Sequence, residues 1–398
     1  MIETWRWFGP KDPISIPEIK QTGATGIVSA RHDVPVGLVW TTDAIQQRKR
    51  EIEQPGDARS GLSWAVVESL PVSEAIKSQS GLIKQHLEAY KASLRNLAEC
   101  GLETVCYNFM PLLDWTRTDL KYPLANGGHA MRFDLVDFAV FDCCLLRRKG
   151  AEEDYAADIL DRAKDRFELL QEDDKRALID TVVAGLPGAN NRWSLDDVRA
   201  MLAIYAGMTP DTLRANLIDF LGEVVPTAQA LGIRLCCHPD DPPFALLGLP
   251  RVMSTLGDYS QILSAVDHPA NGVTFCTGSL GVDPEFDPVA FIKAVGPRIH
   301  FAHLRNTRRA GARDGRRHSF TEAEHLDGDT DMVASIRALL AEEGRRRDEA
   351  RADHAIPFRP DHGHALLTDL ERPTQPGYPL IGRLRGLAEL RGVIKGCT

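Results

Sequence analysis

The sequence predicts a (β/α)8 barrel, in which eight parallel strands alternate with helices, as a single domain of 398 residues. Three observations support this fold class. Short apolar runs alternate with amphipathic stretches along the chain, which is typical of a parallel sheet covered by helices. The apolar runs number eight, and most end in a polar residue, as strands buried on both faces do. No fixed-period repeat or low-complexity tract interrupts this alternation.

The eight strands are expected at residues 4–9, 26–31, 63–69, 104–109, 233–238, 272–277, 298–306 and 356–361. Apolar residues between them recur at spacings of three and four, which places them on one face of a helix. The clearest sets are Ile83, Leu87, Tyr90, Leu94 and Leu97, and near the C-terminus Ile381, Leu384 and Leu387. Thr209 with Pro210 has the pattern of a helix start, and Gly101 and Gly232 have that of helix ends.

Two segments exceed what a minimal barrel needs. After the fourth strand, residues of about 113–205 contain extra helices at 152–170 and 173–186, and we define 147–200 as the helical insert. After the seventh strand, residues 307–331 are polar and are expected to form a long loop. Both segments leave the C-terminal ends of strands, the face on which barrel enzymes build their active sites. The insert is therefore expected to lie over the catalytic face.

Composition excludes several classes of protein. The chain has 56 acidic and 47 basic residues, a net charge of −9, which argues against nucleic acid or an anionic membrane as partner. No apolar run approaches the roughly 20 residues of a spanning helix, and no signal peptide is visible at the N-terminus. The eight cysteines are too sparse for a disulfide scaffold. We therefore expect a cytoplasmic protein with reduced thiols.

Four successive predicted strands each end near a residue that can bind a metal. These residues are His238, Cys276, His303 and Asp361. Two imidazoles, a thiolate and a carboxylate suit a first-row divalent ion, and ligands on separate strands can leave coordination positions open for a substrate. A single histidine or cysteine at a strand end is more often only packed, so the prediction depends on all four occurring on one rim.

Other conspicuous residues have simpler interpretations. Cys236 and Cys237 lie within a predicted strand and are expected in the core. The arginines of residues 308–317 are most simply solvated charge, with attraction of an anionic substrate as the alternative.

Ordered motifs extend over nearly the whole chain. They are WRWFG at 5–9, GIVSA at 26–30, PVG at 35–37, NFMP at 108–111, DWTRT at 114–118, HPDDPP at 238–243, FCTGS at 275–279, HLRN at 303–306, HLDGD at 325–329, RPDHGH at 359–364 and GYPLIGRL at 377–384. In this order and at these strand ends, the motifs resemble the mannonate dehydratase family. The block at about 147–200 resembles the insert of the longer, Gram-negative type of that family.

The resemblance implies an activity and its residues. The activity is the metal-dependent dehydration of D-mannonate, a small aldonic acid, to 2-dehydro-3-deoxy-D-gluconate, a step of hexuronate (glucuronate) catabolism, with Mn²⁺ or Fe²⁺ as cofactor. It implies His362 and Tyr378 as the catalytic acid and base, without deciding which is which. It implies as substrate-binding residues Trp115, Arg305, Asn306, Arg359 and His325. A homo-oligomer is also expected.

Two other classes of function stay open from the sequence. A metal-dependent sugar isomerase on the same barrel would also need histidine and carboxylate ligands, although a thiolate fits its preference for hard oxygen donors poorly. A non-catalytic sugar-acid binding protein would need neither a metal nor proton-transfer residues. The insert is likewise open to two interpretations, a cover over the site or an oligomer contact.

Overall fold

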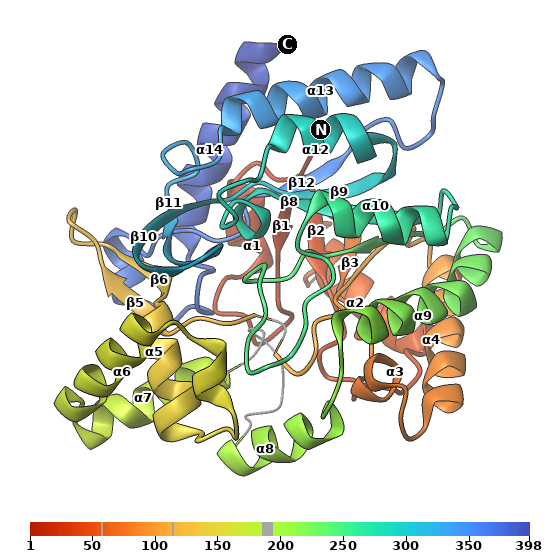
Figure 1. The fold of residues 1–398 in the computed structure, drawn as a ribbon. Coiled ribbons are helices and arrows are strands. Elements are labelled where there is room, and N and C mark those ends of the chain that lie inside the picture. Colours follow the sequence, from red (N-terminus) through yellow and green to blue (C-terminus); the bar gives the residue numbers. More distant parts are fainter. Residues whose placement is uncertain (57–58, 114, 185–193) are drawn as a thin grey trace.

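The computed structural model describes residues 1–56, 59–113, 115–184 and 194–398, and its centre is a closed barrel (Figure 1). Within these residues, eight parallel strands close in the order β1 (Ile2–Arg6), β12 (Pro357–Arg359), β9 (Ile299–His303), β8 (Asn271–Cys276), β7 (Arg234–Cys237), β4 (Thr104–Tyr107), β3 (Ser63–Glu68) and β2 (Gly26–Ser29). Each lies in, or overlaps, one of the eight predicted segments. The predicted fold class is confirmed.

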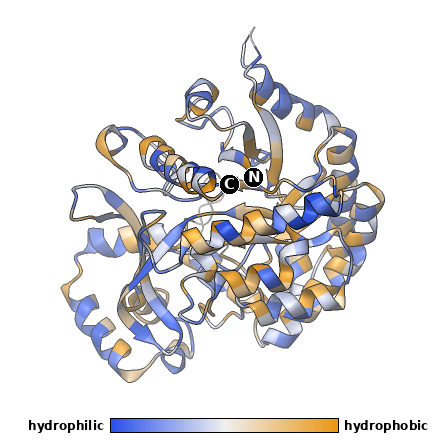
Figure 2. Ribbon diagram, turned by 90° about the horizontal axis from the view of Figure 1, so that it is seen from above, coloured by the Kyte–Doolittle hydropathy of each residue, from blue (hydrophilic) through white to orange (hydrophobic). Residues whose placement is uncertain are grey.

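The helices of the outer ring surround this barrel, and they carry both hydrophobic and hydrophilic residues (Figure 2). They are α1 (Ile16–Gln21), α2 (Thr42–Glu53), α3 (Glu74–Ser78), α4 (Ile83–Glu99), α9 (Pro210–Ala230), α10 (Leu256–Ala265), α12 (Pro288–Val295), α13 (Met332–Asp348) and α14 (Leu380–Cys397). Short helical turns are α11 (Thr277–Leu280), η3 (Gly296–Arg298) and η4 (Leu367–Leu370). No helix in the described part of the chain is both long and apolar enough to cross a membrane.

The predicted helix signals are confirmed at their residues. The Thr209 side chain accepts a hydrogen bond from the backbone N–H of Thr212 at 3.1 Å, and Pro210 opens α9. Gly101 and Gly232 follow α4 and α9 with φ of 76° and 70°, a left-handed conformation that ends a helix at low cost for glycine. The predicted apolar face of α4 is buried at Tyr90, Leu94 and Leu97.

The barrel interior has a small core of its own, distinct from the larger one between barrel and helices. It contains Val28, Val66, Cys106, Cys236 and Phe301. The prediction that Cys236 and Cys237 are core residues is confirmed, since both are buried.

A second sheet stands beside the barrel, which we call the accessory sheet. It is antiparallel, in the order β10 (Asn306–Asp314), β11 (Arg317–Ala323), β6 (His129–Phe133) and β5 (Asp119–Pro123). The prediction of a loop over 307–331 is therefore wrong, because most of that segment is the β10–β11 hairpin. The strands β5 and β6 were missed as well.

The charged residues of the β10–β11 hairpin explain why its sequence does not show the pattern of two strands. Four of its five arginines lie in ion pairs with nearby aspartates: Arg308–Asp327, Arg309–Asp329, Arg316–Asp283 and Arg317–Asp314. Charged residues replace the apolar alternation by which a half-buried strand is predicted. Because these four arginines are paired within the chain, attraction of a substrate is not needed to explain them.

The helical insert packs on the accessory sheet, at the lower left of Figure 1. Its elements, with those that lead into and out of it, are α5 (Leu135–Ala139), the π-helical η1 (Val140–Leu145), η2 (Ala151–Asp154), α6 (Ala157–Leu169), α7 (Glu172–Val182) and α8 (Leu195–Ile204). Residues 185–193, including the end of the second predicted insert helix, lie outside the described residues. One face of α6 is buried, with Ile159 and Ala163 in a second core beside Phe133 and Phe320.

Candidate metal centre and active site

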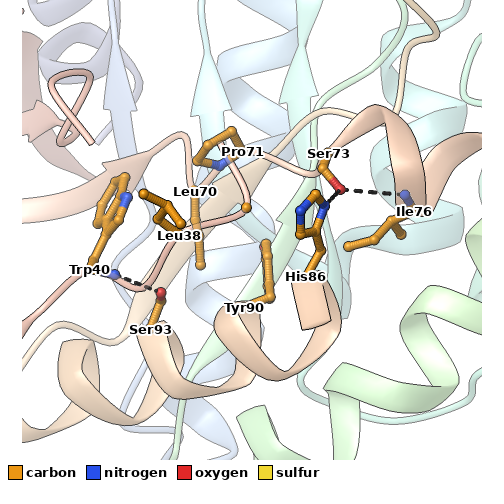
Figure 3. A pocket seen from close by; sticks show the side chains of 10 residues that line it. Leu38, Trp40, Leu70, Pro71, Ser73, Ile76, His86, Tyr90 and Ser93 are labelled. Carbon is orange, nitrogen blue, oxygen red and sulfur yellow. Dashed lines mark hydrogen bonds between the residues drawn. The ribbon is translucent and has the colours of Figure 1, made fainter. Parts of the chain in front are cut away.

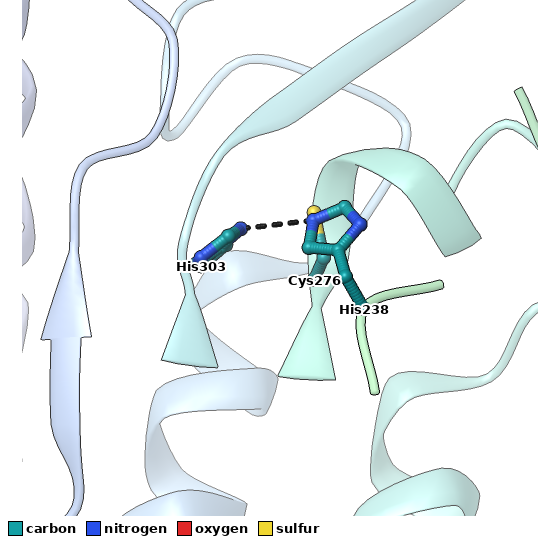
Figure 4. A group of neighbouring side chains, drawn as sticks. All are labelled: His238, Cys276 and His303. Atoms are coloured by element: carbon teal, nitrogen blue, oxygen red, sulfur yellow. Dashed lines mark hydrogen bonds between the residues drawn. The ribbon is translucent and has the colours of Figure 1, made fainter. Parts of the chain in front are cut away.

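The structure brings the four predicted metal ligands together at one rim of the barrel. Cys276 and His303 are the last residues of β8 and β9, His238 directly follows β7, and Asp361 comes two residues after β12. The ligand atoms of His238, Cys276 and His303 lie within 4.8 Å of one another, and their side chains converge in Figure 4. Asp361 Oδ2 is 3.7 Å from His303 Nδ1 and 4.0 Å from Cys276 Sγ.

The surrounding hydrogen bonds orient the rings of His238 and His303, so that one nitrogen of each faces the other candidate ligands. His238 donates from Nδ1 to the carbonyl of Pro239 at 2.7 Å, which leaves Nε2 as its acceptor. His303 Nε2 accepts from Arg359 Nε at 3.2 Å and lies 3.4 Å from Glu68 Oε1, and His303 Nδ1 faces the other ligands, 3.0 Å from His238 Nε2. Burial lowers the pKa of His238, so that its ring is neutral. A neutral imidazole whose far nitrogen is bound to oxygen is the usual arrangement of a metal-ligating histidine, and the donor set therefore fits a divalent ion.

A pocket opens beside these ligands. Its lining is Arg6, Phe8, Glu68, Ser69, Asn108, Met110, Trp115, His238, Asp241, Arg305, Arg359, Asp361, His362 and Tyr378. Both predicted catalytic residues and three of the five predicted substrate-binding residues are in this set. The candidate ligand Asp361 thus lines the same pocket as the proposed acid and base, His362 and Tyr378. Three arginines line it as well: Arg6, Arg305 and Arg359.

Two arginines hold Asp361 as a carboxylate. Arg359 Nη1 contacts Oδ1, and Arg305 Nη1 donates to Oδ2 at 3.0 Å. Burial acts to raise the pKa of Asp361, but the two guanidinium groups outweigh it and hold the pKa well below its usual range. Tyr378 Oη donates to Oδ1 of the same carboxylate at 3.4 Å.

A buried network of ion pairs lies next to the pocket, and sequence reasoning missed its acids. Arg117 binds Asp241 through Nη1 and Nη2 at 2.9 and 3.2 Å and Glu322 Oε1 through Nη2 at 2.7 Å. Arg305 Nη2 lies 2.9 Å from Asp241 Oδ2, and its Nε lies 3.3 Å from Glu322 Oε2. Burial acts to raise the pKa of Glu322, but Arg305, His362 and Arg117 together lower it to about 2.

Comparison with known proteins assigns the chain to a family. The model of the D-mannonate dehydratase (UxuA) family matches residues 1–398. The chain belongs to the D-mannonate dehydratase family. The predicted resemblance and the predicted enzyme class, a hydro-lyase, are confirmed, and the isomerase and binding-protein alternatives are less favoured.

Individual relatives agree over the full length. The mannonate dehydratase of Chromohalobacter salexigens is 56% identical over 393 residues, which is 99% of this chain and 98% of that protein. The mannonate dehydratase of Rhizobium meliloti is 52% identical over 393 residues, 99% of this chain and 96% of that protein. A solved structure of mannonate dehydratase from Streptococcus suis serotype 2 is 31% identical, covers 100% of this chain and 93% of that one, and has a TM-score of 0.75.

Two residues that the family resemblance suggested for substrate binding lie elsewhere. Neither Asn306 nor His325 is among the described lining residues of the pocket. Asn306 donates to the carbonyls of His325 and Thr330 and accepts from the N–H groups of Thr307 and Thr330. It thus fastens the segment after β11 to the start of β10. His325 packs against Gly386 of α14, where a Cβ would lie 2.1 Å from its ring.

A second pocket lies away from the metal centre, between α4 and the loops before α2 and α3 (Figure 3). Most of its polar side chains form hydrogen bonds within the protein. Ser73 Oγ lies 2.7 Å from His86 Nδ1 and caps α3 at Ile76 N, and Ser93 Oγ accepts from Trp40 N at 3.0 Å. These bonds join helix to loop, so the pocket is a packing feature of this fold.

Proposed function

We propose that the chain converts D-mannonate to 2-dehydro-3-deoxy-D-gluconate with loss of water, as an enzyme of hexuronate catabolism in the cytoplasm. Membership of the D-mannonate dehydratase family over the whole chain carries the substrate and the reaction. The composition of the pocket supports it, because three arginines face a space that also holds the candidate ligands and proton-transfer groups.

The metal in this proposal is Mn²⁺ or Fe²⁺, held by His238, Cys276, His303 and Asp361. The thiolate favours a softer ion than Mg²⁺, and the family resemblance favours Mn²⁺ or Fe²⁺. When bound, such an ion supplies Lewis-acid stabilisation of negative charge on the substrate carboxylate and the C2 oxygen.

His362 is assigned as the base that takes the C2 proton and Tyr378 as the acid that protonates the leaving C3 hydroxyl. The Tyr378 hydroxyl donates to Asp361 and therefore carries a proton that it can give. Its ring centroid is 5.1 Å from that of His362, so both groups can reach one bound sugar acid. The resulting enol becomes the 2-keto acid by tautomerisation. Positioned acid and base groups typically contribute 10²–10⁴-fold each.

Substrate binding is assigned to Arg305, Arg359 and Trp115. Both guanidinium groups are ion-paired with Asp361, so they are assigned as positioned donors to the substrate carboxylate and not as unpaired positive charge. Trp115 is buried, and its Nε1 has no hydrogen-bond partner among the described residues, although it belongs to a residue of the pocket wall. An unpaired buried donor is costly, so a substrate oxygen that accepts from it would gain affinity.

Product analysis tests this proposal. Metal-loaded protein is incubated with D-mannonate, and the products are identified by NMR and by a thiobarbiturate assay for keto-deoxy acids. We expect the keto-deoxy acid. An isomerised aldose or ketose would favour the isomerase, and unchanged D-mannonate would overturn the proposal.

A further inference from the structure

We propose that Glu322 is the positioning residue of His362. The carboxylate of Glu322 accepts a hydrogen bond from Nδ1–H of the imidazole, and this leaves Nε2 free to act as the base. The inference rests on the proposed role of His362 as the base of the dehydration. It assigns a catalytic task to the accessory sheet, because Glu322 lies on β11.

The distances fix which nitrogen meets which oxygen. His362 Nδ1 lies 3.0 Å from Glu322 Oε1, and both side chains are buried. The other nitrogen, Nε2, lies 3.9 Å from Oδ1 of Asp361, and both residues line the pocket. A neutral imidazole has one N–H, and a carboxylate can only accept. The proton therefore belongs on Nδ1, and the lone pair on Nε2.

Two arginines keep Glu322 in its carboxylate form. Arg117 Nη2 donates to Oε1 at 2.7 Å, the oxygen that also faces His362, and Arg305 Nε lies 3.3 Å from Oε2. Arg117 is in turn fixed by both oxygens of Asp241. A protonated Glu322 could donate to the ring and reverse the tautomer, and these cations oppose that protonation.

Packing restricts the His362 ring to this orientation. Trp115 and Tyr378 meet it edge-on from ring centroids 6.3 and 5.1 Å away, with interplanar angles of 77° and 90°. Gly377 has φ of 79°, and a Cβ there would lie 2.3 Å from Met131 Cε and 3.1 Å from His362 Cδ2. Glycine at this position therefore lets β6 and the loop before α14 close around the ring.

The proton balance of the step is simple. The C2 proton moves to His362 Nε2, the electron pair of the C–H bond stays with the substrate, and the ring becomes an imidazolium that retains its Nδ1–H. Glu322 stays a carboxylate and stabilises that positive charge. In the serine-protease triad, which has the same logic, loss of the orienting carboxylate lowers kcat about 10⁴-fold.

The first test compares Glu322→Gln with Glu343→Gln. Glu343 is an equally buried carboxylate that binds the N-terminus and the N–H of Ile356, and it lies outside the described lining of the pocket. We expect Glu322→Gln to lower kcat at least about 100-fold, with KM and bound metal within about threefold of wild type. Glu322→Asp, which keeps the charge, should recover part of kcat, and Glu343→Gln should keep it. Wild-type kcat per bound metal in Glu322→Gln would overturn the inference.

The second test reads the tautomer directly and does not depend on activity. Histidine ¹⁵N spectra are recorded for protein loaded with diamagnetic Zn²⁺, and the His362 signals are identified by their loss in His362→Asn. We expect the Nδ1–H tautomer in wild type and a mixture in Glu322→Gln, because an amide can donate as well as accept. An Nε2–H tautomer in wild type would overturn the inference. The Nδ1–H tautomer without turnover of D-mannonate would support it and overturn the proposed function instead.

Discussion

His238 Nε2 and His303 Nδ1 lie 3.0 Å apart, and each of the two rings has its other nitrogen next to a fixed oxygen. Two nitrogens that bind one ion at about 2.1 Å are separated by roughly 3.0–3.4 Å. The spacing of these two nitrogens is therefore close to what a shared cation requires, and the proton of the hydrogen bond that now joins them would leave when the ion binds. The centre is preorganised by the barrel, because His303 ends β9 and His238 directly follows β7, the two strands on either side of β8.

The thiol of Cys276 is the ligand whose removal is easiest to interpret. Cys276→Ser exchanges a soft thiolate for a hydroxyl that stays protonated at neutral pH, so metal affinity should fall at least about tenfold. Bound metal is measured by elemental analysis after dialysis against a metal buffer. Cys236→Ser is the matched control, since Cys236 is equally buried but lies in the barrel interior. Equal metal content in both variants would remove Cys276 from the ligand set.

Variants of the proton-transfer residues should separate chemistry from metal binding. His362→Asn and Tyr378→Phe are expected to lower kcat by about 10²–10⁴-fold while bound metal stays near stoichiometric. The reason is that neither side chain belongs to the proposed ligand set. Steady-state kinetics and elemental analysis on the same samples check this. Turnover at the wild-type rate in both variants would show that they only pack or position the substrate.

The buried acid Glu322 should make the protein sensitive to acid. Its pKa of about 2 in the folded state is below the value of about 4.3 expected in the unfolded chain. A carboxyl group with a lowered folded-state pKa stabilises the fold above the unfolded pKa, and this contribution disappears as the pH falls from about 4.3 toward about 2. Urea unfolding of EDTA-treated protein at pH 6, 4 and 3 measures it. The difference in unfolding free energy between wild type and Glu322→Gln should shrink as the pH falls, and a constant difference would contradict the assignment.

The helical insert is proposed to act as a cover and support of the catalytic face. Its buried residues Ile159 and Ala163 share a core with Phe133 and Phe320 of the accessory sheet, the sheet that carries Glu322. Replacing residues 150–190 with a short Gly/Ser linker should therefore lower kcat several-fold and leave bound metal intact. Kinetics and light scattering are measured on the same preparation. Unchanged activity together with a dissociated oligomer would favour the alternative, an oligomer contact.

The barrel was predictable because its strands are buried on both faces and their sequences are apolar up to the functional residue. His238, Cys276 and His303 could be placed on one rim for that reason alone. Glu322 could not, because it stands in a hairpin whose arginines hide the strand alternation, and a single glutamate in a polar segment has no distinctive signal. Asp241 lies within a motif that drew attention, but its partner Arg117 is 124 positions earlier in the chain. Such pairings follow from the fold and not from local sequence.

The most direct test of the account is the position of deuterium in the product of D-mannonate turned over in D₂O. The enzyme loaded with Mn²⁺ should yield 2-dehydro-3-deoxy-D-gluconate, and its C3 methylene should carry one deuterium, because the enol that remains after loss of water takes a solvent deuteron at C3. The same protein with His362→Asn and full metal occupancy should form it at least about 100-fold more slowly. A product without a C3 methylene, or full activity after verified removal of the metal, would contradict metal-dependent dehydration at this site.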